Sequence, residues 1–342
     1  MAGLIAARPA PAAAGQHFSW RSRKYRSLAY QLLAVLLIAL LGWLLVSNTL
    51  ANMRSRGIQS GFDFLLQPAG FDIGEGWLNY NSTSPYWKAF LAGIVNTLRV
   101  ALTGCLLATL LGTLLGIGRS SRNALLRGIC YGYVELFRNI PLLLQLLMWY
   151  LLFIEYLPPP DQALGIGRFI FLSKNGVSFP SLGWEGGQLR FEVPVAGSMQ
   201  VEGGAALSPE FMAVLLGLVL YTAAFIAEVV RAGIASVPQG QHEAGASIGL
   251  SRAKTMRMIV LPQALRLIIP PLTNQYLNLT KNSSLAVAVG YPELVSVANT
   301  SLNQSGRAVE CIAIIMCVYL GLSLITSAVM DVFNRRVAIK ER

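Results

Sequence analysis

The chain of 342 residues carries little charge. Asp, Glu, Lys and Arg together make up 13% of the residues, whereas hydrophobic residues make up 54%. A soluble domain typically has about 25% charged residues. The apolar residues also form uninterrupted blocks, which excludes a set of ordinary soluble domains and indicates a polytopic membrane protein.

Residues that build active sites are also scarce. The sequence has two histidines, His17 and His242, and four cysteines, so it lacks the clusters that bind a metal or form a disulfide scaffold. It contains no Gly-Lys pair, hence no Walker A loop for nucleotide phosphates, and no nucleophile elbow. We therefore expect no metal, no cofactor and no enzyme that acts alone.

The apolar blocks predict the membrane spans. The first block, 28–46, follows a basic stretch and has 19 residues. The apolar region of a signal peptide has only about 7–15 residues, so we expect a retained helix. Further blocks lie at 89–117, 134–156, 211–231, 264–280 and 308–331, with a shorter one near 284–298. At about 20 residues per span, they predict six helices and one half-length segment.

Basic residues predict the orientation. A cytoplasmic N-terminus places most Lys and Arg side chains inside and leaves the acidic segments 48–88 and 157–209 outside, as the positive-inside rule requires. This distribution explains the net charge of +11 without a nucleic-acid partner. The two outer segments are rich in Gly, Pro, Ser and Asn, so we expect ordered loops there. The predicted parts are a cytoplasmic tail 1–27, an N-terminal helix 28–47, an outer segment 48–88, a membrane core 89–335 that contains the outer insertion 157–209 and the inner loop 232–263, and a cytoplasmic tail 336–342.

Small residues recur at every fourth position of the block 89–117, at Gly104, Ala108, Gly112 and Gly116. Such a stripe lets another helix backbone approach closely. We expect close packing within the bundle, with a dimer seam as the alternative.

The inner loop has the most informative pattern. Residues 239–248 can form a short helix rich in small residues, and Gly249 would end it, because glycine readily takes the left-handed conformation of a helix C-cap. A second short basic helix follows up to Pro262. Taken alone, this stretch would be an amphipathic connector at the membrane surface.

The spacing of Glu243-Ala244-Gly245, Gly249, Ile259 and Leu261-Pro262 resembles the EAA loop of ABC importer permeases, with Gly245 where that family usually has alanine. In that family the loop forms a coupling helix that docks into a groove on the ATPase subunit. We call residues 232–263 the coupling loop. The resemblance implies these ATPase-coupling residues: Gln241, Glu243, Ala244, Gly245, Gly249, Leu261 and Pro262.

Other motifs are similar to those of polar amino-acid permeases of the histidine, glutamine and opine type. They are the segments 93–98, 135–145, 227–234 and 281–285. The extra first helix and the long outer segments look closest to general L-amino-acid permeases of Gram-negative bacteria.

This resemblance implies an all-α polytopic membrane protein, with one N-terminal helix and a five-helix type I ABC importer permease core. The chain would form half of the path of an ATP-driven amino-acid importer in the bacterial inner membrane. It would be non-catalytic, because ATP is hydrolysed on a separate subunit. A periplasmic amino-acid-binding protein would deliver substrate. The second half would be a homologous permease chain, with a homodimer as the alternative.

Polar residues at membrane depth are the candidates for function. The dense polar group at 281–284 predicts a break between half-helices, as in many transporters, with an outer surface turn as the alternative. Glu228 and Arg231 are three residues apart on one helix face, which predicts an ion pair and leaves a gating role as the minority interpretation. The candidate substrate-pathway residues are Asn96, Gln145, Lys281, Asn282, Ser283 and Ser284.

An ion-coupled secondary transporter or channel is the alternative function. It would need carboxylates inside the membrane or an inverted repeat. Glu135, Glu228 and Glu310 are the candidates, all near span ends, and no internal repeat is visible.

Overall fold

The computed structural model describes residues 23–55, 57, 60–167, 169–185, 188–197 and 201–337. Most of the two predicted tails, at 1–22 and 338–342, lies outside the described residues. The chain divides into two units, residues 1–60 and 61–342, which we describe separately.

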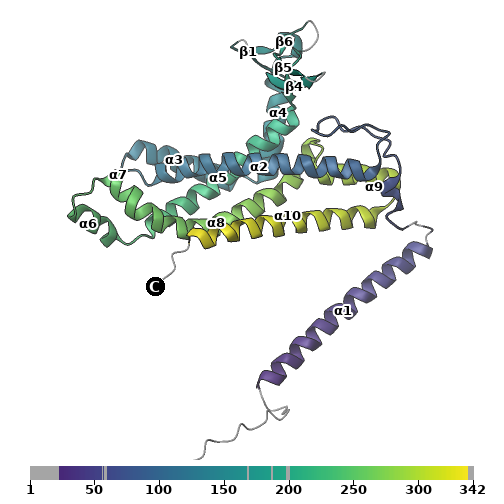
Figure 1. Cartoon of the computed structure of the whole chain (residues 1–342), viewed down its shortest axis with the longest axis horizontal. Helices are drawn as coiled ribbons and strands as arrows, with labels where there is room; N and C mark the ends of the chain where they lie inside the picture. The colour runs from purple at the N-terminus through teal and green to yellow at the C-terminus, as the bar shows by residue number, and fades with distance from the viewer. Residues whose placement is uncertain are drawn as a thin grey trace, which may run out of the picture. The chain divides into compact units, whose positions relative to one another are not determined.

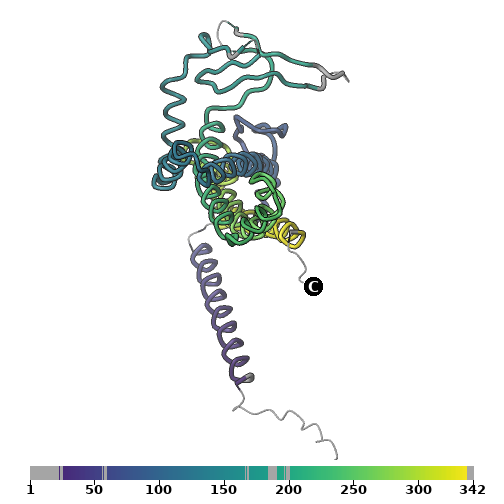
Figure 2. Tube along the Cα trace, turned by 90° about the vertical axis from the view of Figure 1, so that its left-hand side faces the viewer, coloured from purple at the N-terminus to yellow at the C-terminus, as the bar shows by residue number. Residues whose placement is uncertain are grey.

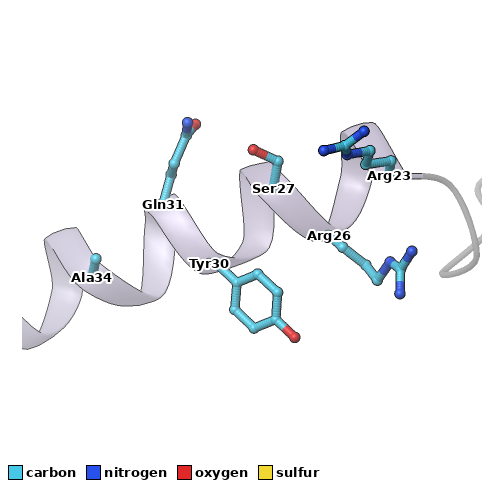
Figure 3. A pocket seen from close by; sticks show the side chains of 6 residues that line it. All are labelled: Arg23, Arg26, Ser27, Tyr30, Gln31 and Ala34. Carbon is cyan, nitrogen blue, oxygen red and sulfur yellow. The ribbon is translucent and has the colours of Figure 1, made fainter.

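The first unit contains one helix, α1 (Arg23–Ser55). Its stretch Arg26–Ser55 is long and apolar enough to cross a membrane. Near its start, Arg26 and Tyr30 extend to the same side of the helix (Figure 3). Basic and aromatic side chains at a span end favour the membrane–water interface, so this end is suited to anchoring the helix.

The second unit is a helix bundle (Figure 1). Its helices are α2 (Tyr86–Arg119), α3 (Ala124–Asn139), α4 (Leu142–Tyr156), α5 (Pro209–Ala235), α6 (Gln239–Ser247), α7 (Arg252–Thr255), α8 (Leu261–Asn282), α9 (Leu294–Ser305) and α10 (Ala308–Val337). Short 3-10 turns lie at η1 (Asp63–Leu66), η2 (Pro160–Gln162) and η4 (Ser283–Val289), and a π-helical turn, η3 (Met256–Val260), joins α7 to α8. In the described part of the whole chain, α1, α2, α5 and α10 can each cross a membrane, and the bent pair α3–α4 raises the number from 4 to 5. The predicted helical, multi-span fold is confirmed.

The small-residue stripe of α2 packs within the bundle, against α5 at Gly112 and Gly116 and against Leu279 of α8 at Gly104. A Cβ atom on Gly112 would lie 2.7 Å from the Cβ of Ile226, and one on Gly116 would lie 2.7 Å from the Cβ of Val230. The absence of these side chains brings the two helices together (Figure 1). The preferred interpretation, close packing within the bundle, is confirmed.

The block 134–156 is not one straight helix but breaks at Pro141, where the missing backbone N–H predicts a kink. Helices α3 and α4 meet at a break with a bend of 102°. Pro141 disfavours helical conformation at the preceding residue, and Ile140 is accordingly extended. The break leaves carbonyl groups without helical partners, and the side chain of Gln145 satisfies two of them, as described below.

The insertion at 157–209 is folded into strands, whereas the sequence predicted loops. The strands are β1 (Leu164–Ile166), β2 (Ile170–Ser173), β3 (Gly176–Phe179), β4 (Ser181–Glu185), β5 (Gln188–Glu192), β6 (Val195–Ala196), β7 (Val201–Glu202) and β8 (Ala205–Leu207). They form an antiparallel sheet of order β1-β2-β3-β8 and two hairpins, β4-β5 and β6-β7. Figure 2 shows these strands as a lobe between the end of α4 and the start of α5. Each strand is too short for a clear alternating pattern, which explains the wrong prediction.

Candidate functional site

The coupling loop folds as the sequence predicted, with a short helix ended by a glycine. Gly249 has a φ of +77°. Its N–H donates to the carbonyl of Ala246, and the N–H of Leu250 donates to that of Gly245, both at 3.0 Å. These two bonds are the Schellman motif, which closes a helix with a left-handed residue.

Gly245 anchors α6 to the segment that follows it. This residue is buried, and a Cβ atom added to it would lie 2.8 Å from Thr255 Cγ2 and 3.1 Å from Ile259 Cδ1. The space that an alanine would need is therefore filled by Thr255. This contact explains physically why glycine suits the position where the EAA pattern usually has alanine.

Most of α6 other than Gly245 is exposed. Gln241, Glu243 and Ala244 are exposed, and Ile248 is 73% exposed. Beside them, a cavity of about 500 Å³ has His242, Glu243, Arg252 and Arg122 in its wall. The helix therefore presents a free surface with an apolar tip. Leu261 and Pro262, the last predicted coupling residues, are exposed at the start of α8.

The predicted ion pair between Glu228 and Arg231 is confirmed, and a third residue joins it. Glu228 accepts from Arg231 Nε at 3.1 Å and also bonds to its terminal nitrogen. Its other carboxylate oxygen pairs with Arg119 at the end of α2. The side chain of Arg119 is only 10% exposed, against 37% for Arg231. Glu228 therefore ties α2 to α5.

Two candidate pathway residues are bonded to backbone. Asn96 donates to the carbonyls of Glu75 and Pro292, at 2.8 and 2.9 Å. Gln145 donates to those of Phe137 and Ile140 at the α3–α4 break, both at 2.9 Å. Both amides are buried. Their amide hydrogens position the chain in this conformation, and a role in the substrate path stays a prediction.

The polar group at 281–284 lies where α8 ends. The α-helix stops at Asn282 and tightens into η4, which Gly290 ends with a φ of +81°. Lys281 is exposed, but Ser283 is buried and donates to the carbonyl of Thr280 at 2.7 Å. Ser284 donates likewise to the carbonyl of Lys281. The helix therefore changes type at the predicted place, whereas Ser283 does not face an open path here.

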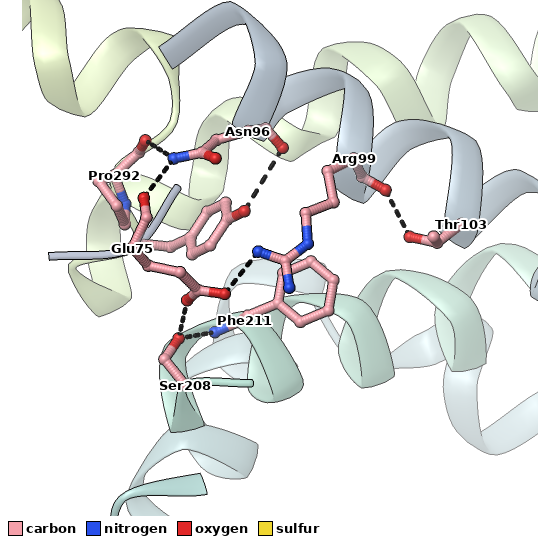
Figure 4. A network of polar contacts seen from close by, with 8 residues as sticks. Glu75, Asn96, Arg99, Thr103, Ser208, Phe211 and Pro292 are labelled. Carbon is pink, nitrogen blue, oxygen red and sulfur yellow. Dashed lines mark hydrogen bonds and ion pairs between the residues drawn. The ribbon is translucent and has the colours of Figure 1, made fainter. Parts of the chain in front are cut away.

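A polar network that was not predicted from the sequence surrounds Arg99 and Glu75 (Figure 4). Arg99 Nη1 donates to Glu75 Oε1 at 2.7 Å, and the hydroxyl of Ser208 bonds to the other carboxylate oxygen. Ser208 also caps α5 by accepting from the N–H of Phe211. The side chains of Arg99 and Glu75 are 8% and 15% exposed. A charged residue inside the apolar block 89–117 was the signal that could have found the network.

The chain is similar in sequence to a family of known proteins. Residues 108–339 match the model of a family described as "binding-protein-dependent transport system inner membrane component". The general L-amino acid transport system permease protein AapQ of Rhizobium johnstonii is 41% identical, over 96% of this chain and 97% of its own length. The putative amino-acid ABC transporter permease protein YhdX of Escherichia coli is also 41% identical, over 95% of this chain and 97% of its own.

A solved structure shows the same fold. An amino acid ABC transporter crystallised with histidines has a TM-score of 0.55 at 24% identity, over 73% of this chain and 95% of the solved one.

Proposed function

This chain belongs to the family of binding-protein-dependent transport system inner membrane components, and from that premise we propose that it carries polar and general L-amino acids across the membrane. It is a non-catalytic, multi-pass permease subunit of an amino-acid ABC importer in the inner membrane. An ATP-binding subunit and a substrate-binding protein are its partners. The class of substrate follows from the names of two relatives that align with nearly its whole length.

The observation that carries the proposal is the coupling loop. A short helix that is capped by Gly249, held to the following turn through Gly245 and exposed along most of its length has the form of a docking element. Its exposed residues include Gln241, Glu243 and Ala244. In the proposed mechanism, closure of the ATPase dimer moves α6 and rocks the permease halves between outward and inward states.

The proposed arrangement places the N-terminus and the coupling loop in the cytoplasm. The segments 48–88 and 157–209 then lie in the periplasm, where the binding protein arrives. We expect the partner half to be a second, homologous permease rather than another copy of this chain. Asn282 and Ser284, beside the end of α8, remain candidate pathway residues.

Reconstitution tests the proposal. The chain, a partner permease, the ATPase and the binding protein are placed in proteoliposomes, and uptake of radiolabelled L-glutamine is measured. Uptake that needs both ATP and the binding protein supports it. Uptake driven by an ion gradient without ATP supports the alternative, a secondary transporter. Replacing the partner permease by a second copy of this chain separates the heterodimer from the homodimer.

The contacts of Glu228 give the secondary transporter no support. Glu228 is paired with two arginines, Arg119 and Arg231. Two cations balance its charge, which suits a structural role.

A further inference from the structure

Glu75, in the outer segment before α2, lies in the wall of two cavities. The first, of about 560 Å³, has Arg99, Trp77 and Phe211 in its wall. The second, of about 440 Å³, has Asp72 and Glu210 in its wall. Glu75 lines both of them. The carboxylate of Glu75 therefore borders both a cavity with a cationic and aromatic wall and a cavity with an acidic wall.

Arg99 is placed to bind a carboxylate. Its guanidinium carbon lies 4.2 Å from the ring centre of Phe211 and 5.3 Å from that of Trp77. The guanidinium group has five N–H donors in a planar fork, so it recognises carboxylates in general. Arg99 lies within the apolar helix α2, level with the start of α5, since Glu75 bonds both to Arg99 and to Ser208, the N-cap of α5. A charged residue inside an apolar span is a candidate functional group.

The ion pair holds together segments that are distant in sequence. Glu75 belongs to the chain before α2, Arg99 lies within α2, and Ser208 caps α5. The carboxylate of Glu75 bonds to both of these partners, and its main-chain carbonyl accepts from Asn96 (Figure 4). This one carboxylate therefore connects the segment before α2 with both α2 and α5.

We propose that Glu75 and Arg99 form a binding site for the zwitterionic backbone of an amino acid, which enters by exchange. The α-carboxylate of the substrate replaces Glu75 on Arg99, and the α-ammonium pairs with the carboxylate of Glu75 that is released. Every charge then has a partner again. A lone carboxylate or a lone amine would leave one group unpaired, which is costly in a buried site.

This exchange also explains breadth of specificity. Both contacts are made to the groups that all amino acids share, while the side chain lies in a cavity whose wall includes Leu106, Leu107 and Leu215. Asp72 and Glu210 make the neighbouring hollow attractive for the ammonium group. The inference rests on the proposed function, since it assumes that amino acids pass through this chain.

Neutralising the pair tests the site in the complete reconstituted transporter. We compare Arg99→Gln, Glu75→Gln and the double variant, with Lys88→Gln as the control, because Lys88 is a cation of the same helix. Uptake of L-glutamine and ATP hydrolysis stimulated by the loaded binding protein are measured at equal membrane abundance. We expect Arg99→Gln and the double variant to lose at least tenfold in uptake and to keep stimulated hydrolysis within twofold. Lys88→Gln should transport normally.

The double variant separates a binding site from a structural ion pair. If the pair only stabilises the fold, removing both charges leaves no charge unpaired and uptake returns toward normal, which would overturn the proposal. If it binds substrate, the double variant stays deficient. If the glutamine variants fail to accumulate, Arg99→Lys replaces them, because it keeps the positive charge but removes the planar guanidinium group. We expect this variant to have a raised KM for uptake. An unchanged KM would also overturn the proposal. Failure of the wild-type complex to import any amino acid would instead refute the proposed function.

Discussion

The N–H of Leu250 donates to the carbonyl of Gly245 at 3.0 Å, across the end of the coupling helix. This bond forms only because Gly249 between them is left-handed, at a φ of +77°. A residue with a side chain is strained at a positive φ, and asparagine is strained less than most residues.

Gly249→Asp should abolish uptake while leaving membrane abundance near normal, because the change strains the cap and places a charge on the docking surface. Uptake, and co-purification of the ATPase subunit, measure the effect. Gly249→Asn is the matched control, since it has the same shape without the charge and tolerates the backbone; we expect partial activity. Normal uptake by Gly249→Asp at wild-type abundance would refute the coupling role of α6.

Glu243→Lys should weaken coupling less than Gly249→Asp does. Glu243 is exposed, and an exposed ion pair contributes only about 0–1 kcal/mol. We expect uptake to fall about threefold, which is within that range of energy. In the Glu243→Lys variant, stimulated ATP hydrolysis should also depend less on salt than in the wild type. The rate of hydrolysis is measured at low and at high ionic strength. A complete loss of uptake would mean that Glu243 has a role beyond a surface contact.

Gly245→Ala should loosen α6 from the turn behind it. The new methyl group would lie 2.8 Å from Thr255 Cγ2, and overpacking of this kind costs about 1–3 kcal/mol. Thr255→Ala in the same chain removes the conflicting atoms. Limited proteolysis of the coupling loop, together with uptake, should show recovery in the double variant. Equal losses in the single and double variants would show that the contact with Thr255 is not the reason for glycine at this position.

Gln145→Leu should destabilise the fold rather than weaken substrate binding. It removes two hydrogen bonds from the carbonyls at the α3–α4 break and leaves buried acceptors unpaired, at a cost of about 1–3 kcal/mol for each. A lower Tm of the purified complex and lower abundance are the expected results, with the KM of the remaining transporter unchanged. A raised KM at normal Tm would instead support the pathway role predicted from the sequence.

Arg119→Gln should be more damaging than Arg231→Gln, although both residues pair with Glu228. The side chain of Arg119 is 10% exposed against 37% for Arg231, so water screens its ion pair less, whereas an exposed pair contributes only about 0–1 kcal/mol. The Tm values of the two purified variants measure the difference. The reverse order would show that the contact between α2 and α5 does not depend on this bridge.

The sequence predicted well those features that depend only on residues close together in the chain. The apolar blocks locate the long helices, and Gly249 ends α6 as expected, since a helix cap involves only adjacent residues. The pair Glu228 and Arg231 is similarly local. The stripe of small residues on α2 indicated close packing, but its partner, α5, follows from the fold alone.

Features that join distant segments escaped prediction. Glu75 and Arg99 are 24 residues apart, and Glu75 and Ser208 are 133 apart, so no periodicity links them. Pro141 marks the place of the break between α3 and α4 in the sequence, but the size of the bend, 102°, follows from the structure alone. The candidate pathway residues were chosen from the sequence because they are polar. The sequence could not show that the side-chain amides of Asn96 and Gln145 donate to backbone carbonyls.

Helix α8 runs from Leu261, directly after the π-helical turn η3, to Asn282, over 22 residues. At about 1.5 Å per residue this is a rod of about 33 Å. A tilt of only about 5° at the α6 end would displace the far end by about 3 Å, the length of a hydrogen bond. Helix α8 is thus a lever by which a small movement of α6 can rearrange hydrogen bonds at the polar group 281–284, while Pro270 and Pro271 within it set how much of that movement is absorbed by bending.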